Sequence, residues 1–235
     1  MENKLNKNFL QLKNINKYYN DSFHILKNIN IEILQGEFVG IIGKSGSGKT
    51  TLLNLIGGLD FPDSGKILYK GEDITEYNKN KKCKFRNEHI GFIFQFHFLL
   101  KELNVLENIL VPSWIKSRYS NIEAQEKAEK YLELMDLKDF SNRKITEISG
   151  GQQQIISIIR SLINNPSIIL ADEPTGNLDS NSAKKIYSLL RKINKEYNIT
   201  FIIVTHDNEF ASLCDRIIEI KDGKIKSLER PLYED

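Results

Sequence analysis

The sequence predicts an α/β protein built on a parallel β-sheet, and three observations predict this fold class. A glycine-rich loop at residues 43–50 lies between a short apolar run at 37–42 and a stretch at 51–56 without proline or glycine, which is the order strand, loop, helix. The apolar runs 168–171 and 200–204 each end in polar residues, as buried parallel strands with a site at their carboxyl ends do. The runs at 9–15 and 28–33 alternate in polarity, which predicts strands with one solvated face.

The other elements follow from the same patterns. Strands are expected at 9–15, 28–33, 37–42, 66–69, 89–95, 168–171 and 200–204, helices at 51–56, 122–137, 152–162 and 183–195, loops at 17–20 and 61–65, and a closing hairpin of 216–220 with 224–228 turned at Asp222 and Gly223. The pattern turns helical from residue 96 to about 139. We therefore predict one domain, in which 1–95 and 163–235 form an α/β core with an antiparallel β subdomain and 96–162 form an inserted helical subdomain.

The composition narrows the class of protein. Of 235 residues, 40% are hydrophobic and 27% charged, and the net charge is only +2, which does not suit a nucleic-acid binder. The Lys-rich segment 73–88 could form a nucleic-acid patch, but a solvated helix face is the better interpretation. Cys83 and Cys214 have no metal-ligand spacing and are expected to be free thiols in a reducing compartment. No apolar run has the roughly 18–20 residues of a membrane span, and the first residues do not resemble a signal peptide, so we expect a soluble chain.

The glycine-rich loop fits the phosphate-binding pattern G-x-x-x-x-G-K-[ST] at every fixed position. Its glycines allow successive N–H groups to point at phosphates, and the following helix directs its positive dipole end at the same anion. We expect Lys49 to reach the β- and γ-phosphates and Thr50 to bind Mg²⁺. The predicted phosphate contacts in this stretch are Gly43, Lys44, Ser45, Gly46, Ser47, Gly48, Lys49, Thr50 and Thr51.

Two further stretches are candidates for catalysis or ligand binding. Asp172 and Glu173 end an apolar strand, and side chains alternate along a strand, so one carboxylate could serve Mg²⁺ while the other accepts a proton from water. An acidic strand end without a role is the alternative. Ser149 is a good N-cap for a helix that begins at a bare Gly150-Gly151 pair, which would make a second anion site. The apolar face of that helix, with Ile155, Ile158, Ile159 and Leu162, is expected to be core.

From Phe9 to about Leu228 the chain resembles the ATP-binding-cassette (ABC) ATPases, whose motifs appear in family order. The resemblance implies a P-loop NTPase (RecA-like) core that hydrolyses ATP with Mg²⁺. It also implies roles for single residues: Tyr19 stacks on adenine, Gln95 is the Q-loop glutamine, Ile148 to Gln152 (with Ser149, Gly150, Gly151) is the signature, Asp172 and Glu173 end Walker B, Asp179 lies in the D-loop Asn177-Leu178-Asp179, and His206 is the switch histidine. Catalysis would use Glu173, His206 and Gln95, and Mg²⁺ would be held by Thr50, Gln95 and Asp172. A histidine that is merely satisfied at a strand end is the alternative for His206. Ile155 stands where the family usually has Arg.

The resemblance also implies partners. In this family the signature of one subunit closes over ATP held by the other, so two copies would form a head-to-tail dimer. A membrane permease would bind a groove near Gln95 and Phe96, and the protein would lie at the cytoplasmic face of the inner (plasma) membrane; no nucleic acid is expected. Phe94, Phe96, Phe98, Leu99, Leu100 and Leu103 either line that groove or fill the helical lobe.

The stretch Gln95 to Leu100 and the following Leu106-Glu107-Asn108-Ile109 resemble the ATPases of lipoprotein-releasing systems, within a group that includes macrolide exporters and the cell-division ATPase that pairs with an FtsX-type membrane protein. A transport motor is the first hypothesis. An ATP switch that regulates cell-envelope partners is the second, and a soluble nucleic-acid ABC protein is the third. The third usually carries two cassettes or long insertions, and neither is present here.

Overall fold

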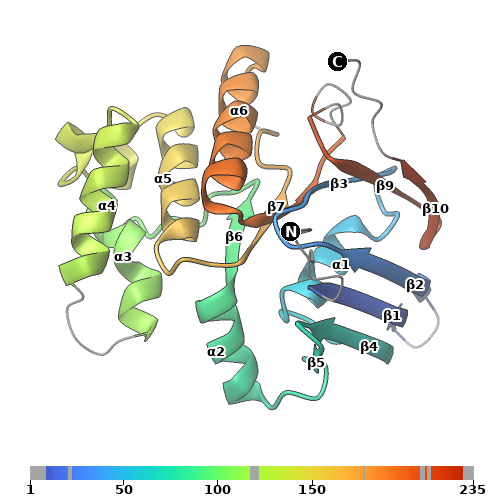
Figure 1. Cartoon of the computed structure of the whole chain (residues 1–235). Coiled ribbons are helices and arrows are strands. Elements are labelled where there is room, and N and C mark those ends of the chain that lie inside the picture. Colours follow the sequence, from blue (N-terminus) through green and yellow to red (C-terminus); the bar gives the residue numbers. More distant parts are fainter. Residues whose placement is uncertain are drawn as a thin grey trace, which may run out of the picture. The chain divides into compact units, whose positions relative to one another are not determined.

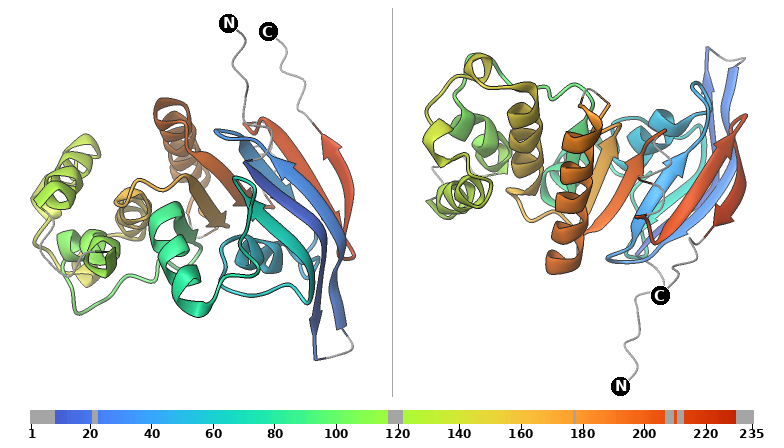
Figure 2. Two further views of the ribbon diagram at one scale, coloured as in Figure 1. Left: turned by 60° about the horizontal axis from the view of Figure 1, so that its bottom comes forward. Right: turned by 90° about the horizontal axis from the view of Figure 1, so that it is seen from above.

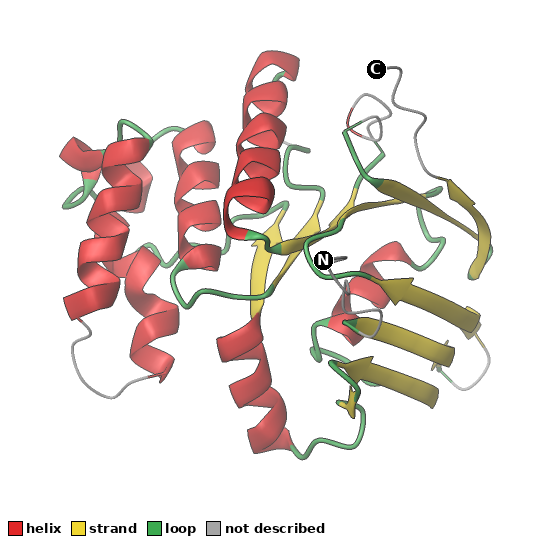
Figure 3. Ribbon diagram, in the orientation of Figure 1, coloured by secondary structure: helices red, strands yellow, loops and turns green. Residues whose placement is uncertain are grey.

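The structure, a computed structural model, describes residues 9–20, 23–116, 122–176, 178–206, 210 and 213–229. Its helices and strands are shown in Figures 1 and 3. The strands are β1 (Leu10–Tyr19), β2 (Phe23–Ile33), β3 (Phe38–Ile42), β4 (Ser64–Tyr69), β5 (Glu72–Asp73), β6 (Ile90–Phe94), β7 (Ile168–Asp172), β8 (Thr200–Val204), β9 (Arg216–Lys221) and β10 (Lys224–Glu229). The helices are α1 (Lys49–Ile56), α2 (Lys79–His89), α3 (Val105–Lys116), α4 (Ile122–Leu134), α5 (Gly150–Leu162) and α6 (Ser180–Tyr197), with short 3₁₀ turns at Lys138–Phe140 and Ile145–Glu147.

The chain divides into two compact units, Met1–Lys82 with Leu190–Asp235, and Cys83–Leu189. The first unit contains an antiparallel sheet in the order β2-β1-β4-β5 and four strands in the order β10-β9-β3-β8. In the latter group β3 pairs in parallel with both β8 and β9, and β9 pairs antiparallel with β10. The predicted mixture of parallel and antiparallel strands is therefore confirmed, and the further views of Figure 2 show the long β1 and β2 running side by side.

The core of the first unit is made of the apolar runs that the sequence marks as buried strands. All five residues of β8 are buried, as are the first four of β3. The rings of Phe38 and Phe201 meet across these two strands with their centroids 5.2 Å apart. The closing hairpin is also as predicted, because Asp222 and Gly223 both take positive φ (50° and 77°), the geometry of a two-residue type I′ turn.

The second unit is mainly helical. Helices α3, α4 and α5 pack against one another, and β6 pairs in parallel with β7. None of the helices that the structure describes combines the length and the apolar character needed to cross a membrane.

The Lys-rich segment is only partly a solvated face, because Lys82 is buried and donates to the Thr75 carbonyl at 3.0 Å, and Lys81 forms an ion pair with Glu72.

The structure corrects several of the predictions. The loop expected at 17–20 is the end of β1, because β2 begins at Phe23 and pairs with β1 as far as Tyr19. Residues 96–104 are not helical: α3 begins only at Val105, where the Asn104 and Glu107 side chains and backbone N–H groups bond reciprocally. Glu173 does not continue its strand, since β7 ends at Asp172 and Glu173 has φ +47°.

Candidate functional site

The glycine-rich loop joins β3 to α1, and two of its glycines are required by their surroundings. At Gly43 φ is +151°, and an added Cβ would lie 2.2 Å from the carbonyl oxygen of Ile220. At Gly48, the N-cap of α1, φ is +104° and an added Cβ would lie 2.7 Å from Cδ2 of Leu26. The loop can therefore take this conformation only with glycine at both positions. Between them, Lys44, Ser45 and Gly46 are exposed, so the outer side of the loop is open.

The polar groups of the loop are arranged for an anion. Lys49 Nζ folds back over the loop and donates to the carbonyl oxygens of Gly43 (2.8 Å) and Lys44 (3.0 Å). Ser47 Oγ is buried and has no hydrogen-bond partner among the described residues. A buried hydroxyl without a partner is costly, and a bound phosphate oxygen would satisfy it. Thr50 and Thr51 follow in the first turn of α1, with Thr50 exposed and Thr51 buried.

His206 lies at the same edge of the sheet as this loop. Ile41 of β3 is paired with Val204 of β8 in parallel, and Thr205 N donates to the Ile41 carbonyl at 3.2 Å. The two strands therefore end together, β3 running into the loop and β8 into the exposed His206. The structure thus brings His206 and the glycine-rich loop to one edge, which the spacing of some 160 residues along the sequence could not show.

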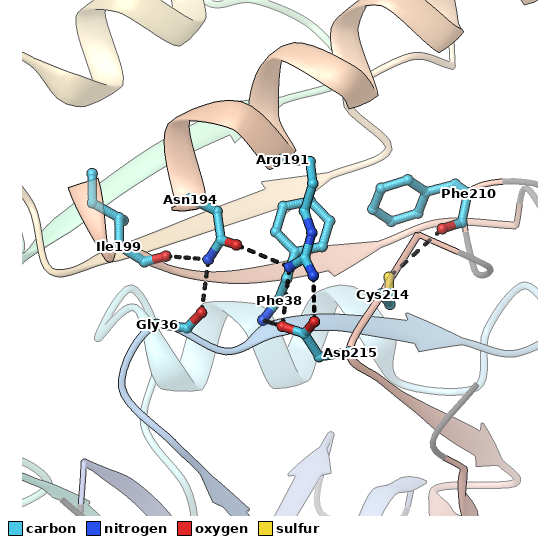
Figure 4. Close-up of polar contacts among 8 residues, drawn as sticks. All are labelled: Gly36, Phe38, Arg191, Asn194, Ile199, Phe210, Cys214 and Asp215. Atoms are coloured by element: carbon cyan, nitrogen blue, oxygen red, sulfur yellow. Dashed lines mark hydrogen bonds and ion pairs between the residues drawn. The ribbon is translucent and has the colours of Figure 1, made fainter. Parts of the chain in front are cut away.

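The segment after β8 is anchored to the start of β3 (Figure 4). The carboxylate of Asp215 accepts from Phe38 N at 2.9 Å and forms an ion pair with Arg191 of α6, whose guanidinium lies 5.1 Å from the centre of the Phe38 ring. Phe210 packs edge-on against the same ring at 5.8 Å. Asn194, one turn further along α6, donates to the Gly36 and Ile199 carbonyls (2.8 and 2.7 Å). These contacts fix Ile199, which directly precedes β8, and Asp215, which directly precedes β9.

The first unit also carries the expected base platform, Tyr19. Tyr18 and Tyr19 are both about two-fifths exposed (41% and 40%), but the Tyr18 ring is stacked on His24 with the centroids 4.0 Å apart. That stacking leaves Tyr19 as the better surface for an incoming aromatic base. The sequence makes the same choice by motif position alone.

In the second unit, Gln95, Asp172 and Glu173 come together. Phe94 of β6 is paired with Asp172 of β7, so Gln95 follows the neighbouring strand end. An added Cβ at Gly176 would lie 2.9 Å from Nε2 of Gln95, which places the glutamine side chain against the turn that carries Glu173. Glu173 has a left-handed φ and lies beyond the end of the strand. Strand alternation therefore does not predict that the side chains of Asp172 and Glu173 point to opposite faces, because alternation applies only within a strand. The direction of the Glu173 side chain is instead set by this turn, which Gly176 N closes on the Glu173 carbonyl at 3.1 Å.

Ser149 caps α5 as predicted. Its hydroxyl accepts from Gln152 N at 3.3 Å, and the Gln152 side chain accepts from Ser149 N at 2.8 Å, which is a reciprocal capping box. An added Cβ at Gly150 or Gly151 would meet nothing within 4 Å, so nothing in the described residues requires glycine there. An open helix N-terminus with two such glycines is suited to the close approach of an anion from outside the chain. Ile155, expected in the core, is only half-buried, and nothing in the structure explains its choice.

Asp179 has a structural task at the start of α6. Its carboxylate accepts from the N–H groups of Asn181 and Ser182 (3.0 Å each) and from the Ser182 hydroxyl at 2.6 Å. The hydrogen bonds from Ser182 lower the pKa of the Asp179 carboxyl. Asn177, the other polar D-loop residue, lies outside the described residues.

The apolar residues after Gln95 divide into two sets. Phe96, Phe98 and Leu100 are exposed (67%, 65% and 46%). Phe94, Leu99 and Leu103 are half-buried. The structure therefore shows an exposed surface of Phe96, Phe98 and Leu100 on a half-buried base, and the groove for a permease stays a prediction.

Two residues that sequence reasoning missed hold this surface in place. Arg160 of α5 donates through Nη2 to the His97 carbonyl (2.6 Å) and through Nη1 to the Phe98 carbonyl (2.8 Å). Asn108 of α3, fully buried, accepts from Leu100 N (2.7 Å) and donates to the Leu100 carbonyl (3.0 Å). The sequence did offer a signal for each residue, because Arg160 is a charged residue on the apolar side of α5 and Asn108 is a polar residue inside an apolar run of α3.

Comparison with known proteins identifies relatives over almost the whole chain. The sequence profile of the family described as "ABC transporter" matches residues 26–176. A protein named "Lipoprotein-releasing system ATP-binding protein LolD" from Wigglesworthia glossinidia brevipalpis is 47% identical over 92% of this chain and 95% of its own length. The protein of the same name from Francisella tularensis subsp. holarctica (strain OSU18) is 42% identical, again over 92% of this chain and 95% of its own length.

Solved structures give the same result. The dimeric structure of a post-hydrolysis state of the ATP-binding cassette MJ0796, bound to ADP and Pi, superposes with a TM-score of 0.86 at 42% identity, covering 94% of this chain and 98% of that one. CbiO1 from Clostridium perfringens, described as part of the ABC transporter complex cbiONQ, has a TM-score of 0.86 at 29% identity, covering 96% of this chain and 89% of that one.

Proposed function

The chain belongs to the ABC transporter family of ATP-binding proteins, and from that premise we propose that it is the ATP-hydrolysing subunit of a transporter that releases lipoproteins from a membrane. The observation that carries the proposal is the identity of 42–47% to proteins named for lipoprotein release, over most of both chains. It would act as a single ATPase domain with a helical subdomain. The envelope-switch alternative is not favoured, because these relatives carry a transport-system name.

ATP is the proposed substrate, with its phosphates in the glycine-rich loop. Lys44, Ser45 and Gly46 are exposed on the outer side of the loop, and the buried Ser47 hydroxyl would bond to a phosphate oxygen. Lys49, now bonded to two loop carbonyls, would turn its charge to the β- and γ-phosphates. Tyr19 would stack on the base.

Mg²⁺ fits the polar groups that the family assigns to it. Thr50, Gln95 and Asp172 offer a hydroxyl, an amide oxygen and a carboxylate, which are hard oxygen ligands, and Mg²⁺ typically takes one or two carboxylates together with phosphate oxygens. When bound, the ion would neutralise charge on the phosphates. Glu173 would orient water and accept its proton, and Gln95 and His206 would sense or align the terminal phosphate.

The site would be completed by a second copy of the chain. The Ser149 N-terminus of α5, with the bare Gly150 and Gly151, would close over the γ-phosphate bound to the partner, with Gln152 and Asp179 beside it. The dimeric arrangement of the related MJ0796 cassette supports this assignment. The exposed surface of Phe96, Phe98 and Leu100 would receive a cytoplasmic segment of the permease, which would hold the protein peripherally at the cytoplasmic face of the membrane.

Glu173→Gln tests the proposal. The substitution keeps the shape of the side chain but removes the base, so hydrolysis should fall by roughly 10²–10⁴ while ATP affinity is retained. With ATP trapped at both sites, size-exclusion chromatography should show a dimer where the wild type is a monomer. In cells, the trapped protein should leave lipoproteins in the membrane from which they are normally released.

Glu126→Gln, an exposed site on α4, is the matched control and should behave as wild type in all three measurements. Hydrolysis by Glu173→Gln at the wild-type rate would remove Glu173 from the mechanism. A normal lipoprotein distribution in cells that contain the trapped dimer would exclude lipoprotein release while leaving the ATPase assignment in place.

A further inference from the structure

A buried lysine lies behind the expected base platform. Lys17 of β1 is only 8% exposed, and its ammonium donates to Asp60 Oδ1 at 2.9 Å and to the Phe61 carbonyl at 2.7 Å. The same ammonium lies 5.6 Å from the centre of the Tyr19 ring, within the range of a cation–π contact. A lysine is rarely buried unless its charge is paired, so this arrangement needs Asp60.

Strand geometry places Lys17 and Tyr19 together. They are two residues apart on β1 and so project from the same face of the strand, and both lie in the segment that pairs with the start of β2. Asp60 then joins them, because its second carboxylate oxygen lies 3.4 Å from the Tyr19 hydroxyl while the first binds Lys17. The 3.4 Å contact is long for a hydroxyl, so the stronger tether is the ion pair with Lys17.

Asp60 is in turn attached to the end of α1. Leu59 N and Asp60 N both donate to the Asn54 carbonyl, at 2.9 and 3.3 Å. Helix α1 begins at Lys49, directly after the glycine-rich loop. A single helix therefore carries the phosphate-binding residues at one end and, through Asp60, contacts Tyr19 at the other.

We propose that Lys17 and Asp60 are positioning residues that hold the Tyr19 ring as the platform for the nucleotide base and align it with the phosphate loop through α1. This inference rests on the proposed ATPase function and adds to it. An exposed tyrosine without a tether can occupy several rotamers, and fixing it before binding lowers the entropic cost of stacking. Neither residue touches the nucleotide; both act through Tyr19.

The test compares two ligands that share three linked phosphates, of which only ATP carries the base that Tyr19 would contact. Calorimetric titration with Mg²⁺-ATP and with Mg²⁺-tripolyphosphate separates base stacking from phosphate binding. Lys17→Met keeps a side chain of similar length but removes its charge. Water can still reach the Asp60 carboxylate, since the Asp60 side chain is 28% exposed. ATP affinity should fall about fivefold, which is the low end of the contribution of one stacked base, while tripolyphosphate affinity stays unchanged.

Double mutants test whether Lys17 acts through Tyr19. In a Tyr19→Ala background, adding Lys17→Met should cause no further loss of ATP affinity, because the platform is already gone. Lys17→Arg, which retains the cation, should recover part of the ATP affinity, and Asp60→Asn should reproduce the pattern of Lys17→Met if the latter does not fold. Lys66→Met is the matched control: it removes the ion pair between exposed Lys66 and half-buried Asp73 (3.2 Å), elsewhere in the same unit, and should change the affinity for neither ligand.

Three results would overturn the inference. They are an equal loss of affinity for ATP and tripolyphosphate in folded Lys17→Met and Asp60→Asn, an additive loss in the Tyr19→Ala background, or wild-type ATP affinity in both single variants. Failure of the proposed function would look different, because the wild-type protein would then bind neither ligand.

Discussion

Arg160 should act as a clamp on the loop that carries Phe96 and Phe98, and Arg160→Met should release it. The substitution removes two charge-assisted hydrogen bonds, of 2.6 Å to the His97 carbonyl and 2.8 Å to the Phe98 carbonyl. Hydrogen bonds to charged groups contribute about 1.5–3 kcal/mol each, and water can replace part of this at a half-exposed loop, so we take about 2–3 kcal/mol for the pair.

Backbone strain adds to this effect. Phe98 has φ +46°, and a left-handed conformation costs a non-glycine residue on the order of 1–2 kcal/mol. Arg160 holds the carbonyl of this strained residue, so its removal lets the loop relax to an ordinary conformation. The 2–3 kcal/mol of lost clamping alone corresponds to an increase of roughly 30- to 150-fold in the opening equilibrium of the loop.

Native-state hydrogen exchange measures that equilibrium directly. The reporter is the Leu100 amide, which is bonded to Asn108 Oδ1 at 2.7 Å in the same loop. Its exchange should be accelerated roughly 30-fold or more in Arg160→Met, and by less in Arg160→Lys, which keeps the charge but lacks the planar fork that spans both carbonyls.

The matched control is Arg143→Met, an exposed arginine of the same unit whose guanidinium stacks on Phe140 at 4.4 Å. It should leave Leu100 exchange unchanged. Unchanged exchange at Leu100 in folded Arg160→Met would mean that the loop is held without Arg160, and the reasoning would be refuted.

Two further predictions follow from the pKa values. Burial, reinforced by Asp215, raises the pKa of the Cys214 thiol to about 12. Native protein should therefore react with Ellman's reagent only at the exposed Cys83, and unfolded protein at both cysteines. Rapid reaction of two thiols in native protein would contradict the burial of Cys214. Burial and the nearby Arg160 charge lower the pKa of His97 in the folded state, so the unfolded chain binds more protons below pH about 6.5, and stability should fall as the pH drops through that value towards the folded pKa. Chemical unfolding at a series of pH values should show a smaller decline in His97→Gln than in wild type, and an equal decline would exclude His97 as the source.

The sequence by itself determined the features whose partners lie close together along the chain. The Ser149–Gln152 box closes within one turn, the Asp222-Gly223 turn joins adjacent strands, and Gly43 and Gly48 take positive φ within the glycine-rich loop. In each case a few neighbouring residues satisfy their own backbone geometry or hydrogen bonds. The order of the motifs along the chain was also sufficient to indicate the family.

Only the tertiary structure decided the features whose partners are far apart in sequence. Lys17 meets Asp60 across 43 residues, and Arg160 reaches the Phe98 carbonyl across 62, so neither contact leaves a local pattern. Pairing with β2 extends β1 through Tyr19 where local composition indicated a loop. Hydrogen bonding between distant segments overrides local preference at these positions, because it pairs backbone and charged groups that no neighbour in sequence pairs.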